Sequence, residues 1–240
     1  MIKSIFTILF LFAICCLLTE NSYTSILGTK GSGKVIENKR EVGKFNNVVL
    51  KGSGDIQISQ GDVYSVSIET DDNIMDLIKT ETNQTSLIIY SEENIDPTKL
   101  IIRITTPDIK GFKIEGSGDI ENKTPIKTSD LILRIDGAGD IKLKNIEAIK
   151  VSAKISGSGD ILVSGKTNLA RISIFGSGDI NFSELESDIV KAEIAGSGDC
   201  KVWAKDELDI RISGSGDFQY KGEPKVFKTK TTGSGSISKY

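Results

Sequence analysis

The stretch Leu131-Ile-Leu-Arg-Ile-Asp-Gly-Ala-Gly-Asp-Ile-Lys-Leu143 decides the fold of this chain. On both sides of the tetrapeptide Gly137–Asp140, every second residue is apolar. A period of two is typical of β-strands that bury one face and leave the other in water. The two glycines allow the wall that they form to bend sharply, or the opposite wall to approach closely. The stretch therefore predicts two short strands joined by a tight corner.

The tetrapeptide Gly-(Ser/Ala)-Gly-Asp is a repeat, and it occurs seven times. From Asp119 onward, successive aspartates are 21, 20, 19, 20 and 18 residues apart. Degenerate copies stand at Gly31–Lys34 and Gly233–Ser236, and we interpret the 64 residues from Asp55 to Asp119 as three further steps. The predicted corner residues are Gly52, Gly54, Asp55, Gly116, Gly118, Asp119, Gly137, Gly139, Asp140, Gly157, Gly159, Asp160, Gly176, Gly178, Asp179, Gly196, Gly198, Asp199, Gly214, Gly216 and Asp217.

A repeat of this length has no room for a helix between parallel strands, but stacked coils can join their apolar faces into one core. The sequence therefore predicts an all-β fold, a right-handed single-stranded parallel β-helix (solenoid) with about 20 residues per coil. We expect this domain over residues 45–240, after a linker or first coil over 26–44. Residues 62–110 lack the motif, and we expect either irregular coils of the same solenoid or an elaborated N-terminal half.

The first 25 residues have the pattern of a signal peptide. Lys3 precedes the apolar run Ile5–Leu18, which is too short to span a bilayer comfortably. We expect export to the periplasm, to the outer surface or out of the cell. Cleavage before Cys16 would leave a lipidation site, although Cys15 fits the position before the cut poorly. A lipid anchor on Cys16 is the one membrane contact that the sequence suggests.

Composition excludes several classes of function. The chain has no histidine, so Ser-His and Cys-His nucleophile pairs are excluded. Its net charge of −3 comes from interspersed signs, which argues against a nucleic-acid partner. We predict no catalytic residue, no cofactor and no metal site.

Stacking places the motif aspartates in one column, where neighbouring carboxylates repel each other by about 1 kcal/mol. Three arrangements would offset or use this charge. Each carboxylate could accept a backbone N–H at its corner or a hydroxyl from the adjacent column of serines, as in an Asx-type cap. Alternatively, adjacent carboxylates could hold a row of Ca²⁺ ions, or two of them could form a catalytic pair. We expect the first, because one carboxylate per motif is few for Ca²⁺ and a uniform column singles out no catalytic site.

Three other side chains near the repeat could carry chemistry. Cys200 stands where other coils have isoleucine, so we expect a buried, inert thiol rather than a reactive one. Trp203 and Tyr220 follow the corner, and we expect them to pack at the C-terminal coils; a sugar-stacking platform is the alternative.

The repeated Gly-Ser-Gly-Asp-Ile and the segment Phe45-Asn-Asn-Val-Val-Leu-Lys-Gly-Ser-Gly-Asp-Ile56 resemble the family called "putative auto-transporter adhesin, head GIN domain". The resemblance implies a right-handed β-helix that is exported to the cell envelope and serves in adhesion. It supplies no catalytic residues.

Two functions follow as alternatives: a non-catalytic, adhesin-like binding or scaffold module, and a carbohydrate-active β-helix enzyme that cleaves polysaccharide. For the binding module we expect a glycan or protein ligand at the cell surface. We also expect self-association or partner docking through the C-terminal coil, because it shows no segment that covers it.

Overall fold

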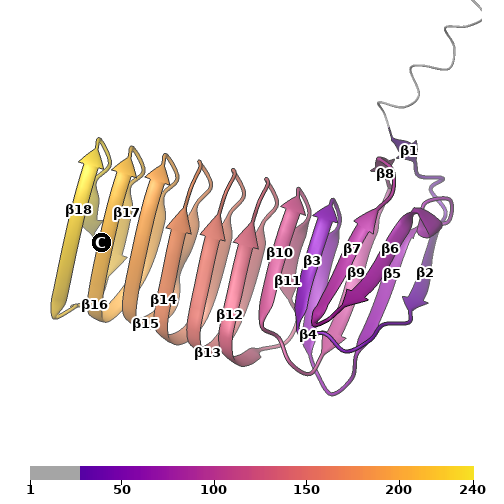
Figure 1. Ribbon diagram of the computed structural model, residues 1–240, viewed down its shortest axis with the longest axis horizontal. Helices are drawn as coiled ribbons and strands as arrows, with labels where there is room; N and C mark the ends of the chain where they lie inside the picture. Colours follow the sequence, from indigo (N-terminus) through magenta and orange to yellow (C-terminus); the bar gives the residue numbers. More distant parts are fainter. Residues whose placement is uncertain (1–27) are drawn as a thin grey trace, which may run out of the picture.

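The computed structural model describes residues 28–240, and they form a rod built from β-strands (Figure 1). The predicted parallel β-solenoid is confirmed, with about 20 residues per turn. The elements in chain order are β1 Thr29–Lys30, β2 Val35–Arg40, β3 Asn47–Gly52, β4 Asp55–Gln60, β5 Ser65–Asp71, the 3₁₀ turn η1 Met75–Leu77, β6 Ile78–Asn83, β7 Ser86–Ser91, β8 Ile95–Asp96, β9 Leu100–Thr106, β10 Gly111–Gly116, β11 Asp119–Asn122, β12 Ile126–Ile135, β13 Ile141–Ile155, β14 Ile161–Ile174, β15 Ile180–Gly196, β16 Cys200–Gly214, β17 Phe218–Lys221, β18 Val226–Gly233 and β19 Ile237–Lys239.

One coil shows how the sequence makes the cross-section. Along β13 the buried positions change parity twice, near Asn145 and near Ile149. Asn145 has a φ of 58°, which marks a bend. These two bends and the glycine corner divide the coil into three short walls. The inward side chains are Ile141, Leu143, Ile146, Ala148, Val151, Ala153 and Ile155.

Identical side chains stack on one another along the rod. Ile135, Ile155, Ile174, Ile194 and Ile212 form one such column, and each is at most 2% exposed. Burial of a side chain of this size stabilises the fold by about 1.5–3 kcal/mol. The core is therefore made by contacts between successive coils, and these contacts fix the register of each coil on the next.

The interval between Asp55 and Asp119 corrects the predicted number of steps. Asp55 pairs directly with Asp119 and Gly52 with Gly116, so the interval is one step of the ladder and not three. The intervening chain stacks on the other side of β3 and β4, because β7 pairs with β3 and β9 pairs with β4. The length of the interval is close to three repeats, yet only one coil within it belongs to the stack.

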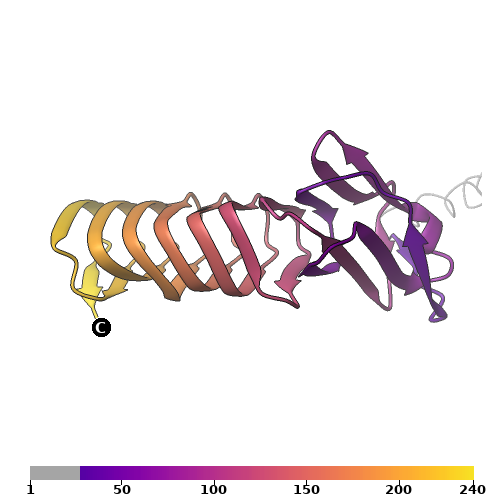
Figure 2. The ribbon, with the colours of Figure 1, turned by 90° about the horizontal axis from the view of Figure 1, so that it is seen from below.

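The rest of that interval forms an antiparallel cap at the N-terminal end of the rod (Figure 2). Strand β5 pairs with β9 and β2, and β6 pairs with β7, all antiparallel. The cap buries Ile74, Met75 and Ile78 against the first coil of the stack, which β7 and β9 form; β3 and β4 form the second coil. Among the described strands, β2 and β6 are therefore outermost at one end of the rod, and β18 and β19 are outermost at the other.

The degenerate motif Gly31–Lys34 is part of this cap and does not stack on the corner at Gly52. The Gly33 N–H donates to Oδ1 of Asp71 at 2.7 Å, and the Ser32 N–H donates to Oδ1 of Asn73 at 2.9 Å. The domain boundaries expected near residues 25 and 44 stay a prediction.

Candidate functional site

The motif aspartates form a ladder of hydrogen bonds along the rod. Oδ1 of each aspartate from Asp119 onward accepts the backbone N–H at the equivalent position of the next coil, at 2.7–3.0 Å. The last bond joins Asp217 to the Ser236 N–H, so six complete turns separate Asp119 from Ser236. The hydrogen bond is of the expected kind, but it links successive coils rather than groups within one corner.

The two ends of the column have different electrostatics. Hydrogen bonds from the Ser236 hydroxyl and backbone N–H lower the pKa of Asp217. At the other end, burial raises the pKa of Asp55, and the charges of Asp119 and Glu121 raise it further. The charged form of Asp217 is thus stabilised, whereas burial and like-charged neighbours disfavour the charged form of Asp55.

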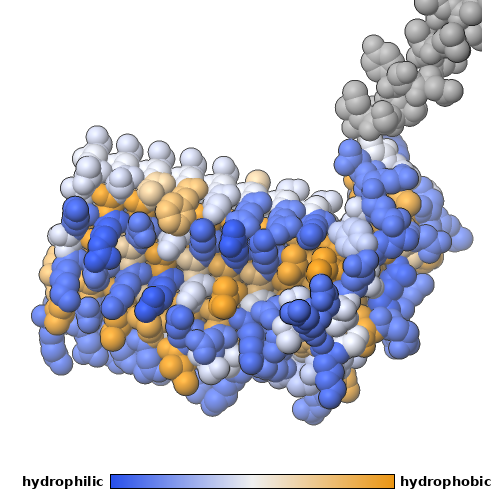
Figure 3. All heavy atoms as spheres, viewed as in Figure 1, coloured by the Kyte–Doolittle hydropathy of each residue, from blue (hydrophilic) through white to orange (hydrophobic). Residues whose placement is uncertain are grey.

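The corner glycines bring successive coils into contact at their backbones. A Cβ on Gly159 would lie 2.0 Å from the Gly139 carbonyl oxygen. The close approach that we expected between opposite walls is therefore an approach between stacked coils. The outer tips of these corners appear as the row of pale, small residues along the upper edge in Figure 3.

Cys200 is fully buried between Ile180 and Phe218, as predicted. Burial raises the pKa of its thiol, and the charges of Asp179 and Asp199 add to the shift. Trp203 and Tyr220 both have packing contacts. The Lys221 Nζ lies 4.6 Å from the centroid of the Trp203 ring, and the rings of Tyr220 and Phe227 are 5.2 Å apart.

Within residues 28–240 no three acidic or cysteine side chains converge as a metal site requires. The absence of a metal stays a prediction. No helix among the described residues is long and apolar enough to cross a membrane. The predicted signal peptide and Cys16 lie outside the described residues.

A groove of about 1130 Å³ lies where one corner is open. In the second coil only four residues connect Leu50 to Asp55, through the tight glycine motif. In the first coil, eleven residues connect the stacked partners Ile89 and Ile101. This longer connection contains β8 and stands above the line of corners in Figure 1. The connection forms a wall beside the shorter glycine corners of the following coils. The groove lies between this wall and those corners.

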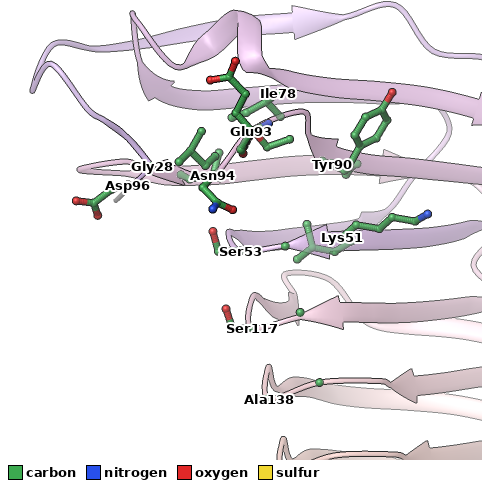
Figure 4. A pocket seen from close by; sticks show the side chains of 18 of the residues that line it. Gly28, Lys51, Ser53, Ile78, Tyr90, Glu93, Asn94, Asp96, Ser117 and Ala138 are labelled. Atoms are coloured by element: carbon green, nitrogen blue, oxygen red, sulfur yellow. Dashed lines mark hydrogen bonds between the residues drawn. The ribbon is translucent and has the colours of Figure 1, made fainter. Parts of the chain in front are cut away.

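Polar side chains surround the groove (Figure 4). Tyr90 is half-buried, and its hydroxyl donates to Oε1 of Glu81 at 2.6 Å. Pairing of β1 with β8 holds the wall that carries Glu93, Asn94 and Asp96. Ser53 and Ser117 point from consecutive corners along its other side.

Several of these groups have free hydrogen-bonding capacity. Among the described residues, no protein hydrogen bond or ion pair engages the side chains of Glu93, Asn94, Ser53 or Ser117. Lys51 has a single weak ion pair, with Nζ 3.7 Å from Oε2 of Glu115. The groove can therefore offer donors and acceptors to a ligand without breaking contacts of the fold.

Sequence reasoning missed the residues of this wall. The signal that points to them is the missing corner motif after the strand Leu87–Tyr90, in a chain whose other coils turn at this corner with Gly-(Ser/Ala)-Gly. The motif residues that the sequence did single out contribute Gly52, Gly116, Gly137 and Gly157 to the groove.

The sequence of this solenoid matches a known protein family. The model of the family described as "putative auto-transporter adhesin, head GIN domain" matches residues 44–224. The chain belongs to this family. The head GIN domain thus includes the first three coils, the antiparallel cap from β5 onward and most of the ladder. No curated protein matches the sequence.

Solved structures share the fold. A protein from Bacteroides fragilis NCTC 9343, described as a putative adhesin, is 26% identical with a TM-score of 0.86, and the match covers 89% of this chain and 100% of that one. A protein from Parabacteroides distasonis ATCC 8503, described as a putative lipid binding protein, is 26% identical with a TM-score of 0.72, covering 88% and 98%. A putative adhesin from the same strain is 23% identical with a TM-score of 0.74, covering 89% and 100%, and it supports the fold alone.

Proposed function

We propose that the protein is an exported, non-catalytic, adhesin-like binding module that presents its groove at the cell envelope. The observation that carries the proposal is the groove itself, which joins free polar side chains to a rigid rod. Membership of the adhesin family and the likeness to adhesin structures support a surface ligand in general. A glycan or protein ligand is the finer form of this proposal.

The carbohydrate-active enzyme is the alternative, and one experiment separates the two. Purified protein is incubated with immobilised cell-surface polysaccharides, and bound protein and released reducing ends are both measured. We expect saturable binding without any time-dependent release of reducing ends. Release that grows with time and with enzyme concentration would contradict the binding module. Mass spectrometry of the mature N-terminus tests export and the lipid anchor on Cys16.

Self-association through the C-terminal coil is a separate proposal. All of β18 is exposed, and Val226 and Phe227 are 41% and 46% exposed. Its lysines, Lys228 and Lys230, oppose the pairing of this edge strand with another chain, and we expect burial of Val226 and Phe227 to outweigh that opposition. We expect light scattering to show concentration-dependent dimers or larger species that Ile237→Pro weakens. A strict monomer at high concentration that is indifferent to Ile237→Pro would refute this.

A further inference from the structure

We propose that the groove binds a linear, neutral glycan that lies along the rod and crosses successive coils. The inference rests on the proposed binding function and names the site and the ligand class.

The groove runs parallel to the rod axis. Its lining includes the corners at Gly52, Gly116, Gly137 and Gly157, which belong to four coils stacked in that order. Three steps between coils span about 14 Å. An occupant that fills the groove is therefore elongated and crosses the strands, and it meets a similar small corner at each step.

An extended peptide does not suit this surface. β-Augmentation needs a row of unpaired main-chain groups at a sheet edge. Here the Ser117 N–H donates to the Gly52 carbonyl at 3.0 Å, and the Ala138 N–H donates to the Gly116 carbonyl at 2.8 Å. The Ser158 N–H continues the same pattern one coil further, so these main-chain donors are already used.

An acyl chain and a polyanion are also poor occupants. Leu50, Ile89 and Ile102 lie beneath the groove, and each is at most 1% exposed, so their side chains offer a lipid tail almost no surface. Ile95 in the wall is partly exposed, but one such side chain is too short to line an acyl chain. The groove's wall carries the acidic Glu93 and Asp96, which repel phosphate, sulfate and uronate groups. Lys51 is the one cationic side chain among the described lining residues.

The polar groups that the groove offers suit the hydroxyl groups of a sugar. Ser53, Ser117 and Ser158 offer a hydroxyl from three of the four corners, while Glu93 and Asn94 offer planar acceptors and an amide donor at the wall. The ring of Tyr90, held by its bond to Glu81, borders the same space. A few fixed polar groups beside an aromatic ring are typical of small-molecule sites that orient a polar ligand.

The test places one bulky side chain inside the groove and the same side chain outside it. Ala138→Trp fills the groove at an exposed corner tip, and Ser197→Trp adds the same ring at the equivalent tip three coils away, outside the groove lining. Cellohexaose, maltohexaose, xylohexaose and laminarihexaose are titrated calorimetrically into the wild-type protein and both variants, with the matching disaccharides as length controls. Equal melting temperatures of the two variants show that both are folded.

We expect at least one hexasaccharide to bind, with at least tenfold weaker affinity for its disaccharide and for the Ala138→Trp variant. Ser197→Trp should leave the affinity unchanged. The inference is overturned if no hexasaccharide binds at millimolar concentration, or if both variants bind as the wild type does. Binding of phosphatidylcholine vesicles or of dextran sulfate that Ala138→Trp abolishes also overturns it. Undiminished binding of Ala138→Trp to cell-surface polysaccharide would refute the groove as the glycan site, while non-catalytic binding by another surface of the protein would stand.

Discussion

Replacement of Gly159 by alanine is expected to destabilise the rod by at least about 3 kcal/mol, although it adds a single methyl group. The new Cβ would lie 2.0 Å from the carbonyl oxygen of Gly139 in the adjacent coil. That oxygen belongs to a backbone held by hydrogen bonds to both neighbouring coils, so it cannot move away without opening the stack. For a chain of this length we expect the melting temperature to fall by roughly 10 °C.

Ser158→Ala is the matched control, because it changes the neighbouring residue of the same corner. Ser158 is exposed, and alanine already occupies the equivalent position at Ala138. We expect a change within about 0.5 kcal/mol, as for other surface substitutions. Thermal unfolding followed by circular dichroism measures both variants. Similar melting temperatures for Gly159→Ala and Ser158→Ala would show that the coils can separate at the corner without cost.

The ladder was predictable because its physical causes repeat in the sequence. Each coil needs an apolar position every second residue and a glycine where backbones meet, and both requirements can be read between Asp119 and Ser236. Once the spacing is known, the stacking of Asp140 on Asp119 follows from the register of the buried isoleucines. The fold between Asp119 and Ser236 could therefore be predicted from periodicity alone.

The N-terminal end was not predictable in the same way. The path from β4 through the cap and back to β7 places a later segment outside an earlier one, so chain order and spatial order differ. Pairing of β5 with both β9 and β2 depends on contacts between distant residues, and no short-range pattern in Ser65–Asp71 indicates it. The groove results from this rearrangement. Tyr90 and Glu93 border it because the first coil lacks a glycine corner.

Cys200→Asp is expected to lower the stability by several kcal/mol, whereas Cys200→Val should be nearly neutral. The side chain is fully buried, with Ile180 on one side and Phe218 on the other. Valine keeps an apolar group of similar size there. A carboxylate would be desolvated without a partner, close to the charges of Asp179 and Asp199 that already raise the pKa of the thiol.

The loss in Cys200→Asp should depend on pH, because protonation removes the buried charge. Burial raises the pKa of such a carboxyl above its unfolded value, so the folded state binds the proton more tightly than the unfolded state. The destabilisation is then largest at neutral and alkaline pH and shrinks as the pH falls through the raised pKa. Urea unfolding of wild type, Cys200→Val and Cys200→Asp between pH 5 and pH 8 measures this. A loss of stability that is equal at both ends of the pH range would point to a packing defect rather than a buried charge. Rapid labelling of the native thiol by a polar reagent would show that Cys200 is accessible to solvent and not buried in the core.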